Sequence, residues 1–243
     1  MSILAINGKI GSGKDTVGSM IRYLTSGCAD PAGKVYRTYD EFMQKGQGNN
    51  DFQTWYNSDW EVKKFADKLK QVAELLTGIP KYKFENQEFK QTTLGPEWNY
   101  PIHETYDGRV TKQMTVRELL QKLGTEAMRE GLHTDVWVNA LMADYYCLDD
   151  SGRVSMGNII DYSNCEFPKW IITDLRFPNE LKSVLDRQGI TIRVTRPGTA
   201  RGTHASETAL DSYPFKYEIS NDGSIDDLLD KVRQILVSEK IIS

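Results

Sequence analysis

The chain has 243 residues, enough for one large α/β domain or for a core with a small lid. Its formal net charge of −4 excludes the general basic surface of a nucleic-acid-binding protein, and no apolar run of about 18 residues predicts a membrane span. The first apolar run is short and leads straight into glycines, so we expect no signal peptide and a cytoplasmic location.

A short apolar run near the amino terminus is followed by a glycine-rich turn and then by a helical pattern. Ile3–Ile6 is predicted as a strand buried on both faces. The spacing Gly8-x4-Gly13-Lys14 is that of a P-loop, and apolar residues recur at helical spacing from Val17 onward. Glycines let backbone N–H groups converge on an anion, and the ammonium of Lys14 adds a full charge that can follow a migrating phosphoryl group.

The residue after Lys14 departs from the usual P-loop pattern. Asp15 stands where serine or threonine is usual, so Thr16 supplies the nearest hydroxyl for a magnesium ion. A chance glycine turn is the alternative, but the strand before it and the helix after it favour phosphate binding. The residues expected to hold nucleotide phosphates are Gly8, Gly11, Ser12, Gly13, Lys14, Asp15 and Thr16.

A polar insertion near residues 28–60 follows the first helix. It is rich in glycine, asparagine, glutamine and aspartate, and it also carries aromatic residues such as Phe42. Aromatic side chains in a polar segment could stack on a base. More often they anchor a long excursion to the core, which is the interpretation we favour.

A second strand is predicted over Val62–Ala66, and Asp67 opens a helix that ends at Gly78. The predicted apolar face of this helix comprises Leu69, Val72, Ala73, Leu75 and Leu76. Asp67 and Lys70 lie where the strand passes into the helix, at the sheet edge where ligands bind in open α/β folds. Contact with a substrate is one interpretation, and helix capping with solvated lysines is the equal alternative.

Residues 81–113 have no clear hydrophobic period and are interpreted as a second insertion with a hairpin. Thr115 and Glu118 then have the form of a capping box that begins a helix. Gly124 is expected to end that helix, and a further helical piece carries Arg129.

The remaining strands are predicted at Trp170–Thr173, Ile190–Thr195 and Tyr217–Ser220. Asp174 follows the first of these at the expected ligand-binding edge, so its carboxylate is the candidate to reach a magnesium ion or its water shell; a helix-capping or ion-paired aspartate is the alternative. Strands and helices alternate throughout, which predicts a doubly wound, mostly parallel α/β domain.

Two arginines and a polar segment complete the candidate site. The guanidinium forks of Arg129 and Arg176 could each grip a phosphate, although either could instead form a structural ion pair. The polar segment near 197–215 suits a lid that closes over phosphates and excludes water. His204 and Glu207 lie within it, and hydrogen bonding inside the lid is the preferred account of this pair.

Eight motifs together resemble the phage deoxynucleoside monophosphate kinase family. They are GKIGSGKDT at 8–16, FADKLK at 65–70, LGTEAMR at 123–129, DVWV at 135–138, ITDLRFPNE at 172–180, TRPG at 195–198, HASE at 204–207 and SNDGSIDDL at 220–228. The likeness extends over nearly the whole chain. The P-loop alone indicates only a nucleotide, whereas the later motifs are much more specific.

The resemblance implies one P-loop kinase domain over 1–243, with an adenylate-kinase-like core of about five parallel strands, the two insertions and the lid. It also implies transfer of the ATP γ-phosphoryl group to a deoxynucleoside monophosphate, with magnesium, in the host cytoplasm if a phage encodes the chain. By the same resemblance Lys14, Arg129 and Arg176 are catalytic, Thr16 and Asp174 serve the metal, and Arg196 and Pro197 lie against adenine. The acceptor side is expected to involve Asp67, Lys70, Arg129, Arg176 and Glu207.

Two alternatives stay open at this point. The acceptor could be another small phosphorylated molecule of the dephospho-CoA or phosphomevalonate type, or the chain could be a P-loop ATPase or nucleotide-binding module without an acceptor. We expect neither a nucleic acid nor a membrane as partner. The sequence leaves a homodimer, the accepted base and the choice between deoxyribose and ribose open.

Overall fold

The computed structural model describes residues 2–30, 32–46, 58–105, 108–147, 166–199 and 208–243. The chain forms two compact units, which are described separately. The first comprises Met1–Lys64 and Met142–Ser243, and the second is the continuous segment Phe65–Leu141. Within the described residues, we find no helix with the length and apolar character that a bilayer crossing requires.

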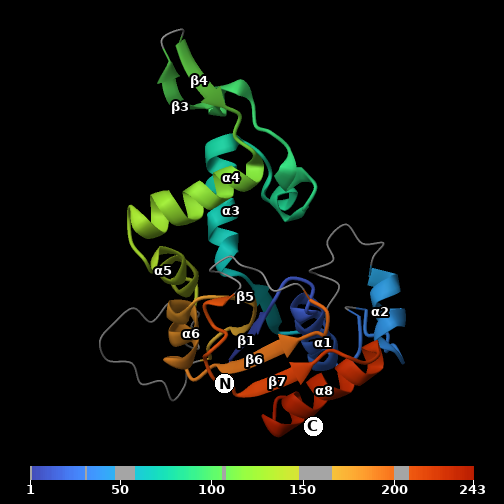
Figure 1. The fold of residues 1–243 in the computed structure, drawn as a ribbon. Helices are drawn as coiled ribbons and strands as arrows, with labels where there is room; N and C mark the ends of the chain where they lie inside the picture. The colour runs from blue at the N-terminus through green and yellow to red at the C-terminus, as the bar shows by residue number, and fades with distance from the viewer. Residues whose placement is uncertain (1, 31, 47–57, 106–107, 148–165, 200–207) are drawn as a thin grey trace. The chain divides into compact units, whose positions relative to one another are not determined.

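The first unit is built on a five-stranded sheet with the order β2-β5-β1-β6-β7 (Figure 1). Its strands are β1 (Ile3–Gly8), β2 (Trp60–Lys63), β5 (Lys169–Leu175), β6 (Ile190–Thr195) and β7 (Tyr217–Ser220). Every neighbouring pair is parallel. The predicted α/β fold with about five parallel strands is therefore confirmed, and β1 lies at its centre.

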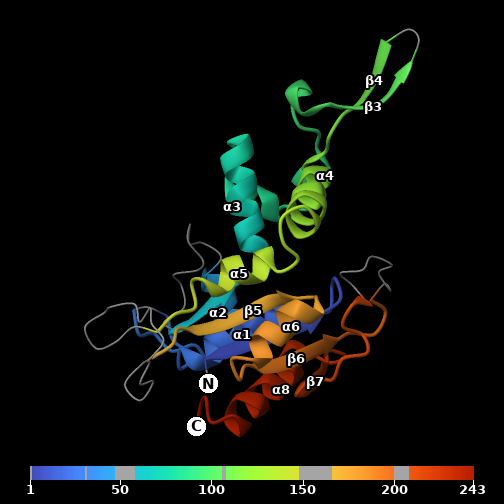
Figure 2. The same ribbon diagram turned by 90° about the vertical axis from the view of Figure 1, so that its left-hand side faces the viewer.

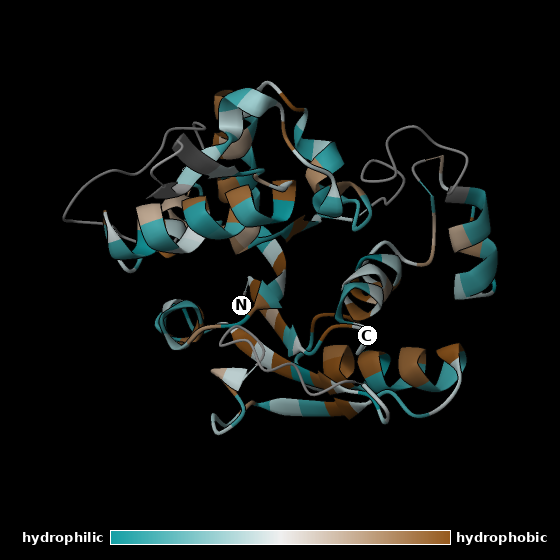
Figure 3. Ribbon diagram, turned by 45° about the horizontal axis from the view of Figure 1, so that its top comes forward, coloured by the Kyte–Doolittle hydropathy of each residue, from teal (hydrophilic) through white to brown (hydrophobic). Residues whose placement is uncertain are grey.

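Helices cover both faces of this sheet. Leu4 and Ile6 of β1 share one buried core with the inner sides of α1 (Lys14–Thr25) and α8 (Ile225–Ser238). Side chains alternate across a strand, so Ile3 points to the opposite face. There it lies beside the end of α6 (Pro178–Leu185), because a Cβ at Gly189 would meet both Val184 and Ile3. In Figure 3 hydrophobic residues run along the strands and along the helix that carries the carboxyl terminus.

The described part of the first predicted insertion is anchored to the core by aromatic side chains. Helix α2 (Tyr39–Gly46) buries Tyr39 and Phe42 completely or nearly so. The ring of Phe42 lies 5.1 Å from that of Tyr23 in α1 and 5.5 Å from that of Tyr36. The favoured interpretation of Phe42 as an anchor is therefore confirmed.

The second unit contains helices and a hairpin. Its elements are α3 (Phe65–Thr77), η2 (Lys81–Glu85), η3 (Phe89–Gln91), η4 (Pro96–Trp98), β3 (Tyr100–Thr105), β4 (Gly108–Lys112), α4 (Val116–Gln121), η5 (Lys122–Glu130) and the start of α5 (Val136–Met142). The antiparallel pairing of β3 with β4 confirms the predicted hairpin, which extends away from α3 and α4 in both views (Figures 1 and 2). Ala73, Phe84 and Val116 form the centre of a small core.

Several predicted boundaries in this part of the chain are wrong. Strand β2 ends at Lys63, and α3 already begins at Phe65, whose ring is 2% exposed. Leu75 and Leu76, both predicted on the apolar face, are 85% and 53% exposed. Leu75 lies two residues from the buried Ala73, so the helical period turns it away from that residue.

Gly124 does not end the helix that begins after Thr115. Helix α4 continues directly into η5, a π-helix in which the chain closes hydrogen bonds over five residues. A Cβ at Gly124 would approach Leu69 of α3 to 3.0 Å. The glycine therefore serves close packing between helices rather than helix termination.

Candidate functional site

The glycine-rich turn lies between the carboxyl end of β1 and the first residue of α1, in the predicted order of strand, loop and helix. Gly11 and Gly13 have φ angles of 80° and 99°, a left-handed backbone that glycine adopts without strain. Ser12 N donates to Lys9 O over 3.1 Å, and Val17 N donates to Gly13 O over 2.9 Å. The turn therefore folds back on itself and passes directly into the helix.

Close neighbours leave no room for larger side chains in this turn. A Cβ at Gly8 would lie 2.8 Å from the carbonyl oxygen of Val194 in β6. A Cβ at Gly13 would lie 2.5 Å from Nδ2 of Asn221, the residue that follows β7. Glycine is therefore required at Gly8 by contact, and at Gly13 by contact as well as by its left-handed conformation.

Lys14 is the first residue of α1, and its side chain is folded back over the loop. The residue is 9% exposed. Its Nζ donates to Lys9 O over 3.4 Å, a long contact that a stronger acceptor could replace. The ammonium thus lies over the same turn whose backbone N–H groups precede the helix.

The carboxylate of Asp15 is engaged by two neighbours in the first unit. Thr173 Oγ1 of β5 donates to Asp15 Oδ1 over 3.0 Å, and Lys64 Nζ lies 3.2 Å from the same oxygen. Burial acts to raise the pKa of Asp15, but Lys64, Thr173 and Lys14 outweigh it and hold the pKa below its usual value. Asp15 is therefore an ionised link between α1, β5 and the residue after β2.

Asp174 lies inside β5 rather than after it, because β5 extends to Leu175. Asn7 near the end of β1 is paired with Leu175, and its Nδ2 donates to Leu175 O over 2.9 Å. The carboxyl ends of both strands thus meet at one edge, with Asp174 one residue from this contact. Alternation along β5 places Asp174 on the face opposite to Thr173, which faces α1.

The turn after β5 is fixed by a buried carboxylate. Glu180 is 2% exposed and accepts hydrogen bonds from the backbone N–H groups of Arg176 and Phe177 over 2.8 and 3.1 Å. These are donors at the start of α6 that the helix itself leaves unpaired. Arg176 therefore follows the same sheet edge as Asp174 on a backbone held in one conformation.

The turn that contains Arg196 and Pro197 lies beside the glycine loop. Gly198 has a φ angle of 78°, and Thr199 donates to Arg196 O through both its N–H group and its Oγ1, over 3.3 and 2.8 Å. The methyl group of Thr199 is 3.9 Å from the position of a Cβ on Gly11. The structure therefore brings this turn and the glycine loop together.

Part of the predicted lid is described, and it is tied to the core. Arg193 of β6 donates to the carbonyl oxygens of Leu210 and Tyr213 over 2.5 and 2.9 Å. Lys9 of the glycine loop pairs with Asp211 at 3.4 Å. His204 and Glu207 lie outside the described residues.

The other predicted substrate residues belong to the second unit, where two of them have internal partners. Asp67 pairs with Lys81 Nζ at 3.3 Å. Lys70 is 6% exposed, and its ammonium forms an ion pair with Glu85. Arg129 lies in η5. The alternative of solvated lysines is wrong for Lys70, because its ammonium is buried and paired with Glu85; the ion pairs of Asp67 and Lys70 both lie within the second unit.

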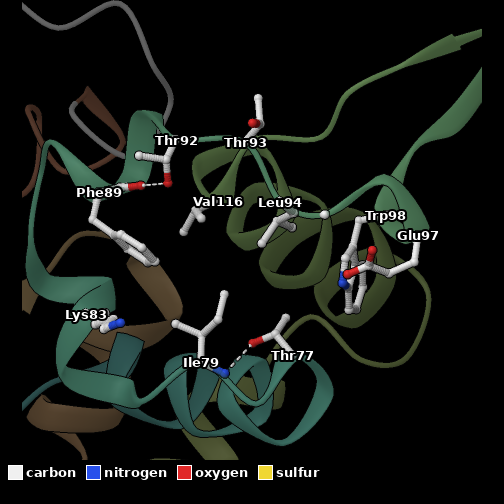
Figure 4. A pocket seen from close by; sticks show the side chains of 11 residues that line it. Thr77, Ile79, Lys83, Phe89, Thr92, Thr93, Leu94, Glu97, Trp98 and Val116 are labelled. Atoms are coloured by element: carbon white, nitrogen blue, oxygen red, sulfur yellow. Dashed lines mark hydrogen bonds between the residues drawn. The ribbon is translucent and has the colours of Figure 1, made fainter.

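The second unit also contains a cavity of about 360 Å³, and Asp67, Lys70 and Arg129 are not among the residues that line it. Phe89 and Ile79 point toward its middle in Figure 4, and Leu94 and Val116 lie behind them. Thr77 and Thr92 use their hydroxyls locally, since Thr77 Oγ1 accepts from Ile79 N and Thr92 Oγ1 donates to Phe89 O. Apolar side chains and polar groups such as Lys83 and Glu97 thus line the cavity together, and the hydroxyls of Thr77 and Thr92 are already engaged by neighbouring backbone.

Three residues around the glycine loop were not identified from the sequence. Lys64 and Thr173 hold Asp15, and Asn221 donates from Nδ2 to Ser12 O over 2.9 Å. Each contact joins segments that are far apart in the chain. For Asn221 the available signal was its place after a strand in the SNDG motif, which identified a turn but not its partner.

Comparison of the sequence with known proteins finds relatives of one family. A model of the deoxynucleotide monophosphate kinase family matches residues 2–232. The chain is 27% identical over 128 residues to the deoxynucleotide monophosphate kinase of Enterobacteria phage T4, which covers 52% of this chain and 47% of that protein. It is also 27% identical over 123 residues to the deoxynucleotide monophosphate kinase of Escherichia phage RB69, with 50% and 45% covered.

The matches to these two phage proteins span somewhat less than half of the length of each relative. The family model, in contrast, covers nearly all of the present sequence. It includes the glycine loop, the end of β5 and the turn after β7, which the structure gathers around α1. The chain belongs to the deoxynucleotide monophosphate kinase family.

Proposed function

We propose that the protein transfers the γ-phosphoryl group of ATP to a deoxynucleoside monophosphate and releases ADP and the deoxynucleoside diphosphate. The observation that carries this proposal is the loop Gly8–Lys14, which has strand, left-handed glycines and helix in the geometry of a phosphate site. Membership of the deoxynucleotide monophosphate kinase family supplies the acceptor class.

The reaction requires positioning and charge neutralisation rather than a protein nucleophile. A phosphate oxygen of the acceptor attacks the γ-phosphorus, and the bond from that phosphorus to the β-γ bridging oxygen breaks. The N–H groups of the loop and the amino end of α1 hold the polyphosphate. The Lys14 ammonium, already lying over the loop, neutralises the charge that moves with the phosphoryl group.

Magnesium is part of the proposal, and two residues offer the hard oxygen ligands that this ion prefers. We assign them as Thr16, in the first turn of α1, and Asp174, near the end of β5. Asp15 is not assigned to the metal, because Thr173 and Lys64 already engage its carboxylate. When bound, the ion neutralises charge on the β- and γ-phosphates.

The remaining assignments follow the family and the local contacts. Arg176 and Arg129 are the guanidinium groups proposed for the acceptor or the transferring phosphate. The turn at Arg196 and Pro197 is proposed to lie against adenine, since it borders the glycine loop at Gly11. Asp67, Lys70 and Glu207 stay candidates for the acceptor side. The proposed location is the cytoplasm, which is the host cytoplasm if a phage encodes this chain as phages encode its two relatives.

An assay of ADP release tests the proposal against its alternatives. The full chain is incubated with ATP and magnesium, together with each deoxynucleoside monophosphate, its ribose counterpart, dephospho-CoA, phosphomevalonate or no acceptor. Release that depends on a deoxynucleoside monophosphate is the expected result. Release that requires one of the other acceptors, or none, contradicts the proposal. Lys14→Ala in parallel identifies any contaminating activity.

A further inference from the structure

Asn221 links the last strand of the sheet to the glycine loop. Its backbone N–H donates to Thr195 O over 2.7 Å, which continues the pairing of β7 with β6. Its side-chain Nδ2 donates to Ser12 O over 2.9 Å, across 209 positions of sequence. The acceptor belongs to the peptide that joins Ser12 to Gly13, in the middle of the phosphate loop.

That peptide has two accessible orientations. Gly13 is left-handed, with φ 99° and ψ 14°, and glycine adopts either sign of φ at little cost. Turning the peptide plane over would exchange the N–H group of Gly13 for the carbonyl oxygen of Ser12 on the side that faces an anion. An N–H group attracts phosphate and a carbonyl oxygen repels it. The orientation of this one peptide therefore bears directly on anion affinity.

We propose that Asn221 is a positioning residue of the phosphate loop. Its carboxamide engages the Ser12 carbonyl and so keeps the Gly13 N–H group available to the polyphosphate. The inference rests on the proposed phosphate-binding role of Gly8–Lys14. Asn221 itself does not touch the nucleotide in this account, because it acts through the backbone.

The turn that carries Asn221 is built to hold one geometry. Lys231 Nζ donates to Ser220 O over 2.6 Å and pairs with Asp222 at 3.0 Å, and Ser220 Oγ donates to Asp222 Oδ2 over 2.9 Å. The approach to the loop is also close, because a Cβ on Gly13 would lie 2.5 Å from Asn221 Nδ2. The carboxamide is thus delivered to the loop by a turn that is fixed on both sides.

Binding of inorganic tripolyphosphate to the full chain, measured by calorimetry, tests this inference without any transfer step. Asn221→Ala removes the donor, and Asn221→Asp keeps the shape but places an acceptor against the carbonyl. Tyr217→Phe is the matched control, since it removes hydrogen bonds to Ser238 and Glu239 from the same strand without touching the turn or Ser12. The melting temperature of each unliganded variant reports its stability.

We expect both Asn221 variants to raise the dissociation constant for tripolyphosphate by about threefold to tenfold, the effect of one lost hydrogen bond. Tyr217→Phe should lower the melting temperature yet leave the dissociation constant within about twofold of the parent. With ATP, the Asn221 variants should raise KM more than they lower kcat. Unchanged tripolyphosphate affinity in both, or equal weakening in Tyr217→Phe, overturns the inference.

The outcome is separable from that of the proposed function. If no acceptor supports ADP release but the Asn221 variants still weaken tripolyphosphate binding, the kinase assignment fails and the positioning role stands. If deoxynucleoside monophosphates are phosphorylated and the Asn221 variants bind tripolyphosphate normally, the positioning role fails alone.

Discussion

Thr173 Oγ1 donates a hydrogen bond to Asp15 Oδ1 over 3.0 Å, although 158 positions separate the two residues. Lys64 Nζ reaches the same carboxylate oxygen at 3.2 Å. One carboxylate therefore joins the first turn of α1 to β5 and to the residue that follows β2. The position where most P-loops carry a hydroxyl is here used to hold the sheet and the first helix together.

The Asp15 contacts predict how stability depends on pH. The folded protein holds the pKa of Asp15 below 3.8, so the stability from this carboxylate is present above that value and is lost as pH falls through the folded pKa. Because the Asp15 side chain is 64% exposed, the contribution should be no more than about 1 kcal/mol. Urea unfolding from about pH 6 to about pH 3 should show the gap between parent and Asp15→Asn closing with acid. A gap that is constant over this range contradicts the role.

Removing the ammonium of Lys14 should abolish most transfer while the fold persists. Lys14→Met keeps the buried stem and Lys14→Ala removes it, so the two variants separate charge from packing. Loss of one preorganised charge at a transferring group should lower kcat by at least about 100-fold in both. Near-normal ADP release from a correctly folded Lys14→Met would remove this residue from the site.

Asp174→Asn should change the response to magnesium. The amide preserves the shape of the side chain but is a weaker ligand for a hard cation. The magnesium concentration that gives half-maximal turnover should rise by about tenfold or more. Thr16→Val, which deletes the other proposed ligand oxygen, should move the same titration in the same direction. An unchanged magnesium curve for Asp174→Asn excludes it from the metal site.

The ion pair of Lys70 with Glu85 predicts an asymmetry in stability. The Lys70 side chain is 7% exposed and that of Glu85 is 48% exposed. Glu85→Ala therefore leaves the buried Lys70 ammonium without this carboxylate and should lower the free energy of unfolding by about 2 kcal/mol. Lys70→Met leaves the Glu85 carboxylate in contact with water and should lower the free energy of unfolding by about 1 kcal/mol or less. Urea unfolding measures both free energies. Equal effects would show that burial of the lysine does not govern the pair.

Those parts of the fold that depend on local pattern were predictable from the sequence. Strands β1 and β5 stand out as apolar runs, and the glycine loop is recognised by its spacing. The end of β5 was predicted wrongly, because the apolar pattern that indicated the strand ends where the charged Asp174 begins. In the structure β5 extends beyond Asp174, because Leu175 still pairs with Asn7 of β1 and accepts a hydrogen bond from its side chain.

Of the candidate site, the sequence predicted only those residues that can be identified within a single segment of the chain. The loop residues and Asp174 follow from position within one segment. Lys64, Thr173 and Asn221 act through partners that are distant in sequence, and no period or motif names such a partner. Lys70 illustrates the same limit in the other unit, because a lysine on a helix looks solvated until its pairing with Glu85 is known.

The π-helix η5 makes the register of the segment around Arg129 sensitive to chain length. Gly131 N bonds to Glu126 O over 3.1 Å and His133 N to Met128 O over 2.9 Å, each across five residues instead of four. Deleting one residue between Lys122 and Arg129 would let the segment relax into an ordinary α-helix and would turn the arginine by about 100° around the axis. Deleting a single codon here would thus point the Arg129 guanidinium in another direction, although the amino-acid composition of the chain would hardly change.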